Sequence, residues 1–242
     1  MNDLQAVVRS AVPYRIRRVL RTVHQYFVFS HAMKRFLNDP EACRHRENPV
    51  LRDLIYGWGN AEWSAQDEYL ADCIDHALTS HGSILECGSG LTTILLGTIA
   101  NMRGRSYWAL EHNPKWARKI RGWLNWYGLN SVLLCEAPLK DYGEFSWYDA
   151  PLDSMPGSFS LIVCDGPPGG TNGGRYGLVP IMCERLAPGC IILLDDAERE
   201  QERAIARRWQ DEMSASFEIV GSIKPFIELT VMVPMAEEPR ST

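Results

Sequence analysis

The sequence predicts an α/β fold in which a mostly parallel sheet is built by helical crossovers and closed by an antiparallel terminal hairpin. Two observations carry this prediction. Short apolar runs alternate with helix-like segments from residue 83 to about residue 212, which is the order that crossover connections produce. The last two strand-like runs, in "FEIVGSIKPFIELTVMVP", are separated by a short turn without a helix, so we expect them to pair antiparallel.

The length and composition are those of a globular protein. A chain of 242 residues accommodates one α/β domain and an appendage, and 45% hydrophobic with 23% charged residues argues against disorder. There is no apolar run of about 18 residues and no secretory signal pattern, so we expect a soluble, cytoplasmic protein. Seven cysteines without a C-x-x-C pair indicate reduced thiols rather than a zinc or disulfide framework.

The first 46 residues are predicted to form a basic helical arm and linker, and residues 47–242 the main domain. The arm holds nine Lys/Arg against three Asp/Glu, about +6, which leaves about −11 for the rest. A helix beginning near Pro13 would place arginines in its first turns and apolar residues at helical spacing: Arg15, Arg17, Arg18 and Arg21; Ile16, Leu20, Val23, Phe27, Met33 and Phe36. The apolar side could pack on the main domain, on a second copy of the chain, or on an anionic membrane surface.

The remaining elements follow in order. Residues 39–49 read as a linker, and a second helix follows, with Ser64 as N-cap and Asp67 three residues on. Strands are predicted at 84–86, 106–111, 131–135, 159–164 and 190–194, and helices at 92–100, 114–127, 176–186 and 197–212.

The first strand ends in the turn "LECGSGLTT", which indicates a nucleotide site. Gly88 and Gly90 allow a tight turn and a close approach of the backbone to a ligand, at the start of a helix with unpaired N–H groups. Thr93 stands where a dinucleotide-binding fingerprint has its third glycine. Glu86, just before the glycines, would repel a pyrophosphate but attract an ammonium or sulfonium ion. The turn therefore favours S-adenosylmethionine over a nicotinamide dinucleotide.

Acidic residues also end the next two strands. Glu111 lies 25 positions after Glu86, where a carboxylate could accept both hydroxyls of a ribose; the alternative is a solvated acid. His112 could flank an adenine ring or simply lie in the loop. Glu136, after the third strand, could meet an adenine amino group, and the sequence leaves this open.

These motifs resemble those of the class I S-adenosylmethionine-dependent methyltransferases. The similarity comprises E-x-G-S-G at 86–90, Glu111, "LIVCDGPPG" at 161–169 and "LAPGCIILLDDA" at 186–197, within residues 60–233. It implies a seven-stranded Rossmann-like methyltransferase sheet whose last strand is antiparallel. It also implies a cofactor site for the methionine part, the ribose and the adenine, made of Glu86, Gly88, Ser89, Gly90, Thr92, Thr93, Glu111, His112 and Glu136.

Three further carboxylates, Asp165, Asp195 and Asp196, end the fourth and fifth strands. In a parallel sheet they would converge beside the cofactor, where like charges are costly without a cation. The arrangement resembles the divalent-metal site of the catechol O-methyltransferase-like group, although an aspartate replaces the usual asparagine of the pair. Oxygen ligands suit Mg²⁺ or another hard cation. Alternatively, Asp165 contacts the cofactor or acts as a base, and the other two cap a helix.

The acceptor site is less well defined by the sequence. In the loop "DGPPGGTNGGRYG", Arg175 and Tyr176 could face the acceptor, and Arg175 is a candidate catalytic residue with Asp165 and Asp195. The aromatic segment "DYGEFSWYD" could stack on a ring or sugar, and Trp63 and Tyr69 could cover the cofactor. Packing in the core is the alternative for each aromatic residue.

The sequence thus predicts an S-adenosylmethionine-dependent methyltransferase acting on a hydroxyl of a small molecule or glycan, with or without a divalent metal. The alternatives are an NAD(P)-dependent oxidoreductase and a non-catalytic adaptor that docks through the basic arm. The acidic main domain argues against nucleic acid as a partner. Peripheral contact of the arm with the inner membrane surface and homo-oligomer formation both remain open.

Overall fold

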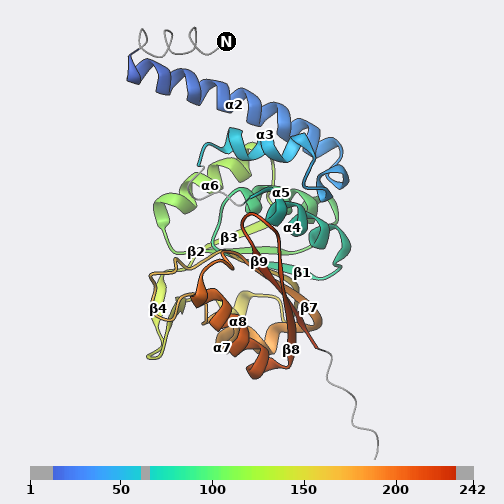
Figure 1. The fold of residues 1–242 in the computed structure, drawn as a ribbon, viewed down its shortest axis with the longest axis vertical. Helices are drawn as coiled ribbons and strands as arrows, with labels where there is room; N and C mark the ends of the chain where they lie inside the picture. Colours follow the sequence, from blue (N-terminus) through green and yellow to red (C-terminus); the bar gives the residue numbers. More distant parts are fainter. Residues whose placement is uncertain (1–12, 61–65, 233–242) are drawn as a thin grey trace, which may run out of the picture.

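The computed structural model describes residues 13–60 and 66–232 and contains the predicted sheet (Figure 1). Seven strands pair in the order β3-β2-β1-β6-β7-β9-β8. Their bounds are β1 Ser83–Cys87, β2 Tyr107–Glu111, β3 Val132–Glu136, β6 Phe159–Cys164, β7 Leu186–Leu194, β8 Ala215–Val220 and β9 Phe226–Val231. The first five are parallel, and β9 runs antiparallel to both β7 and β8. The predicted fold class, including the terminal hairpin, is confirmed.

Helices cover both faces of this sheet. Five lie on one face: α2 Tyr14–Asn38, α3 Pro49–Trp58, α4 Asp67–Thr79, α5 Leu91–Met102 and α6 Pro114–Trp126. On the other face lie α7 Leu178–Met182 and α8 Glu200–Met213. Because side chains alternate along each strand, the sheet contributes to two hydrophobic cores, with Ile84 in the first and Leu85 in the second.

Several elements differ from their predicted form. The linker contains a short helix, Glu41–Arg44. It is followed by α3, which was not predicted from the sequence. The signal for α3 is Asn48, which caps the helix by accepting a hydrogen bond from the Val50 amide. Ser64 lies outside the described residues, and α4 begins only at Asp67. A separate hairpin of β4 (Leu139–Asp141) and β5 (Ser146–Tyr148) follows β3.

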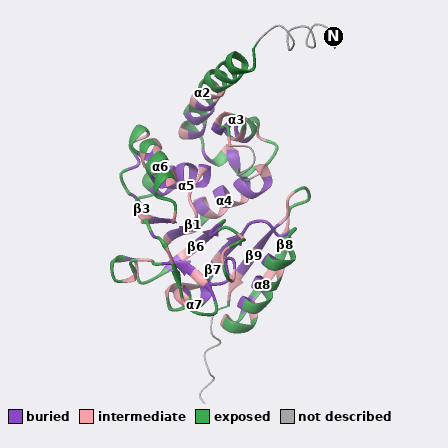
Figure 2. Ribbon diagram, turned by 90° about the vertical axis from the view of Figure 1, so that its left-hand side faces the viewer, coloured by how far each residue is buried: buried purple, intermediate pink, exposed green. Residues whose placement is uncertain are grey.

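The N-terminal arm is divided between solvent and core. Phe29, Met33 and Phe36, in the second half of α2, are buried in the same core as the sheet. The first half projects past the body of the molecule and is exposed (Figure 2). The predicted boundary at 46/47 therefore does not coincide with a break in the core. Within residues 13–60 and 66–232, no helix is both long and apolar enough to cross a membrane.

Candidate functional site

A cavity of about 520 Å³ opens at the carboxyl ends of β1, β2, β6 and β7. The chain proceeds from β1 to β2 and β3 on one side, then returns to form β6 on the other side of β1. Open α/β sheets bind ligands at such a switch point, and a cavity of this size accommodates a small organic ligand.

The glycine turn lies at one wall of the cavity. Gly88 has φ +91°, a conformation that L side chains rarely adopt, and an added Cβ would lie 3.2 Å from the Gly166 amide nitrogen. Gly90 differs, because its backbone is extended and an added Cβ would meet no atom within 4 Å. It lines the cavity, so the missing side chain leaves room for a ligand. Thr93 holds the turn by accepting a hydrogen bond from the Gly90 amide at 2.8 Å.

Glu86 is a buried carboxylate at the cavity that has no cation beside it among the described residues. Its hydrogen-bond donors are three neutral hydroxyls, those of Thr92, Thr93 (2.6 Å) and Tyr107 (2.8 Å). Desolvation raises the pKa of Glu86 to about 7. A ligand that brings an ammonium or sulfonium charge would supply the missing cation.

Glu111 faces the glycine turn from the end of β2. Its Oε2 accepts a hydrogen bond from the Ser89 hydroxyl at 2.7 Å, and its Oε1 accepts one from the Asn113 amide at 2.8 Å. Trp116 Nε1 donates to the Ser89 carbonyl at 2.7 Å and fixes the turn from the other side. His112 also lines the cavity, with Nδ1 3.4 Å from Glu111 Oε1. The carboxylate is thus held in place at the cavity wall, as a group that binds a diol requires.

Four candidate residues are not part of this site as described. Glu136 ends the edge strand β3, lies outside the cavity lining and pairs with Arg121 at 2.8 Å. Tyr69 is buried and donates to the Leu193 carbonyl at 3.2 Å, which is a packing role. Tyr176 is buried, donates to Glu212 and lies outside the lining. Trp63 lies outside the described residues.

The three aspartates converge as predicted, with their oxygens within 4.8 Å of one another. Asp195 and Asp196 are buried, whereas the Asp165 side chain is 41% exposed and faces the cavity. Desolvation raises the pKa of Asp165 to about 7, and Arg175 opposes the shift. This group therefore combines access to the cavity with a pKa near neutrality, as a general base requires.

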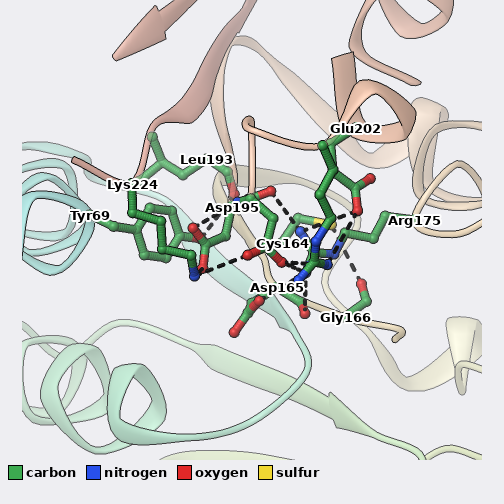
Figure 3. Close-up of polar contacts among 11 residues, drawn as sticks. Tyr69, Cys164, Asp165, Gly166, Arg175, Leu193, Asp195, Glu202 and Lys224 are labelled. Carbon is green, nitrogen blue, oxygen red and sulfur yellow. Dashed lines mark hydrogen bonds and ion pairs between the residues drawn. The ribbon is translucent and has the colours of Figure 1, made fainter. Parts of the chain in front are cut away.

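Three cations of the chain already neutralise the aspartates. Arg175 and Lys224 approach them from opposite sides (Figure 3), and Arg199 Nη1 lies 2.8 Å from Asp196 Oδ2. Arg175, 2% exposed, donates from Nη2 to Asp165 Oδ1 (2.9 Å) and Asp196 Oδ2 (2.7 Å). Lys224 Nζ lies 3.0 Å from both Asp195 Oδ2 and Asp196 Oδ1. Arg175 is therefore a buried residue of the site and not a surface residue. The residues as placed do not fit a divalent ion, because each aspartate already has an ammonium or guanidinium on at least one oxygen.

Lys224 reaches the site because the β8–β9 hairpin is clamped to the first turn of α4. Glu68 accepts hydrogen bonds from the Ser222 amide at 2.8 Å and the Ile223 amide at 3.2 Å. Gly221, at φ +91°, makes the turn that precedes them. Lys224, the residue that follows Ile223, thus enters the cavity from the far end of the chain.

Sequence reasoning missed several other cavity residues: Trp58, Asn60, Trp116, Tyr148, Arg199 and Lys224. Tyr148 belonged to the aromatic segment "DYGEFSWYD", and Trp58 and Asn60 belong to the stretch "WGNAEWSAQDEYL", which was expected to cover the cofactor through Trp63 and Tyr69. The neighbours of Tyr148, Phe145 and Trp147, are core residues. The Tyr148 hydroxyl is buried and has no hydrogen-bond partner among the described residues, which leaves a donor at the cavity for a ligand.

No protein-family model matches the chain, and no curated protein matches its sequence. Solved structures do match in fold. An O-methyltransferase from Bacillus cereus, in complex with S-adenosylhomocysteine, is 18% identical with a TM-score of 0.52, over 76% of this chain and 91% of the other. An S-adenosylhomocysteine-bound methyltransferase from Podospora anserina is 16% identical with a TM-score of 0.51, over 95% and 96%. A precorrin-6Y C5,15-methyltransferase from Geobacter metallireducens is 19% identical with a TM-score of 0.51, over 70% and 89%.

The fold is that of the class I S-adenosylmethionine-dependent methyltransferases. At these identities the similarity establishes the architecture. It confirms, at the level of the fold, the resemblance carried by the sequence motifs.

Proposed function

We propose that this protein is an S-adenosylmethionine-dependent methyltransferase that acts on a hydroxyl group without a divalent metal. The observation that carries the proposal is the pair of buried carboxylates, Glu86 and Glu111, beside a glycine that leaves the cavity wall bare. Glu86 would hold the cationic methionine end and Glu111 the ribose hydroxyls. When bound, the sulfonium supplies an activated methyl group for in-line displacement.

The acceptor class follows from the charges of the cavity. Its lining holds five carboxylates against three basic side chains, which disfavours a phosphodiester or another polyanion. Asp165 is the accessible carboxylate of the trio and would take the proton of an acceptor hydroxyl. The unpartnered Tyr148 hydroxyl could orient the same acceptor. A small molecule or a glycan with free hydroxyls fits this lining.

Arg175 and Lys224 would do in this site what a metal does elsewhere, which is to neutralise the carboxylates at the strand ends. Arg175 holds Asp165 and Asp196 together and also donates to the Asp195 carbonyl at 2.7 Å. Arg175 is therefore a positioning residue for the proposed base.

Calorimetric titration with S-adenosylhomocysteine tests the cofactor assignment. Wild type should bind at micromolar concentration with or without EDTA. Glu111→Ala should bind about 10- to 100-fold more weakly, because hydrogen bonds to a charged group are lost. Glu136→Gln is the matched control, since Glu136 ends the adjacent strand but lies outside the cavity. Unchanged binding by Glu111→Ala would contradict the site.

A parallel titration with NADH separates the alternatives. Binding of NADH in preference to S-adenosylhomocysteine would favour an oxidoreductase, and binding of neither would favour the adaptor. Transfer of a labelled methyl group to a panel of phenols and sugars, with and without EDTA, then tests the acceptor class and metal independence. Activity that required added Mg²⁺ would refute the second part of the proposal.

A further inference from the structure

The outer half of α2 presents an apolar stripe that residues 13–60 and 66–232 leave uncovered. Six apolar side chains, each at least 44% exposed, recur at intervals of three and four residues: Ile16, Val19, Leu20, Val23, Tyr26 and Phe27. At 100° per residue they fall within a sector of about 120°. Such a contiguous apolar face marks a binding surface.

The stripe is not a continuation of the face that packs into the core. The buried side chains of the inner half, which include Phe29, Met33 and Phe36, lie in a sector centred about 130° away on the helix. Packing of the apolar side on the main domain, one of the three alternatives for the arm, therefore applies to the inner half of α2 and not to the outer half. Some other surface has to cover it.

The charge of the outer half of α2 indicates which kind of surface covers the stripe. Four arginines share the outer half with the stripe, and α2 contains no Asp or Glu. Within the described parts of the chain, no carboxylate forms an ion pair with Arg15, Arg17, Arg18 or Arg21. Cations in the first turns of a helix also oppose its dipole, so these arginines destabilise the free helix slightly. A negatively charged surface would offset that cost.

We infer that the outer half of α2 lies on an anionic lipid bilayer, with the stripe in the acyl boundary and the arginines at the headgroups. One surface then satisfies the apolar side chains and the basic ones together. A second copy of the chain fits less well, because it would cover the stripe but would add four more arginines and no acidic residue from its own α2.

The test is sedimentation of the full chain with vesicles. Wild type should bind vesicles of phosphatidylcholine with 30–50% phosphatidylglycerol, bind pure phosphatidylcholine weakly, and be released by about 0.5 M salt. The triple variant Arg17→Gln, Arg18→Gln, Arg21→Gln should bind about a hundredfold more weakly. Removal of three exposed cations elsewhere, Arg52→Gln, Lys115→Gln, Arg118→Gln, is the matched control and should have little effect.

A variant of the stripe, Ile16→Ser, Leu20→Ser, Phe27→Ser, should also lose binding to the charged vesicles while keeping its thermal midpoint, because these side chains are exposed. Light scattering in solution addresses the second copy. A wild-type dimer that the stripe variant abolishes, without vesicle binding by either protein, would overturn the proposal. Equal loss of binding in the arginine variant and its control would overturn the role of the arm.

Discussion

Replacing Lys224 by methionine should convert the aspartate trio into a cation site. The side chain is 26% exposed, and its ammonium lies 3.0 Å from one oxygen of Asp195 and one of Asp196, both buried. At that distance the Coulomb attraction is about 5 kcal/mol for each pair at an effective dielectric constant of about 20, before the ammonium is desolvated. Removing one partner of a buried ion pair typically destabilises by about 3 kcal/mol or more, because the remaining charge is uncompensated.

The Lys224→Met variant should therefore unfold about 6–10 °C below wild type at pH 7. Added Mn²⁺ should restore the loss, since it can bind the two freed oxygens. With a dissociation constant near 0.1 mM, for example, 10 mM Mn²⁺ would return about 2.7 kcal/mol. Wild type should show no stabilisation by Mn²⁺. Thermal unfolding and Mn²⁺ titration calorimetry measure both effects.

Lys140→Met is the control, because Lys140 pairs with Asp149 at the surface, away from the cavity. It should neither lower the thermal midpoint much nor create Mn²⁺ binding. If wild type bound Mn²⁺ as tightly as the Lys224→Met variant, the trio would be a metal site after all, and the reasoning from Lys224 would be refuted.

Three other variants probe features already described. Gly90→Val should weaken the binding of S-adenosylhomocysteine, measured by calorimetry, at least about a hundredfold, because the new side chain enters the cavity. The thermal midpoint should stay unchanged, because the side chain meets no protein atom there. Binding as tight as that of wild type would contradict the assignment of the cavity wall. The hydrogen bond from the Ser222 amide lowers the pKa of Glu68 to about 2, so the stabilisation of the fold by ionised Glu68 is present above pH 4.5 and is lost as the pH falls towards 2. Glu68→Gln should therefore lower the free energy of unfolding in urea by about 2 kcal/mol at pH 7 and leave it unchanged near pH 2. A loss that did not depend on pH would refute the charge effect. Gly57→Ala should lower the free energy of unfolding by about 2 kcal/mol, because the new Cβ would lie 2.6 Å from the Phe29 amide nitrogen. An unchanged thermal midpoint would show instead that α2 and α3 can move apart without cost.

The part of the site that is local in sequence could be predicted. Glu86, Gly88 and Gly90 share one turn, and Glu111 ends the neighbouring strand, so their meeting follows from strand order alone. The same argument does not place Glu136, because β3 is an edge strand whose end lies beyond the cavity and beside Arg121.

Lys224 could not be predicted by such reasoning. Its position depends on the hairpin turn at Gly221 and on the Glu68 clamp, which joins residues 154 positions apart. Arg175 and Tyr176 show a related difficulty, because adjacent residues in a glycine-rich loop point into different surroundings. The Arg175 guanidinium donates a hydrogen bond to Asp196 within the aspartate trio. The Tyr176 ring instead packs against Arg208, whose guanidinium carbon lies 3.6 Å from the ring centroid.

The helix α2 is continuous from Tyr14 to Asn38, without an internal glycine or proline. Its inner half is immobilised in the core and its outer half projects from the body, so the two halves share one rigid axis. Any surface that binds the outer half of α2 consequently fixes the orientation of the whole molecule and the direction in which the cavity opens. On the bilayer proposed above, the arm would orient the molecule as well as attach it, and it would present the cavity to acceptors at a constant angle and height.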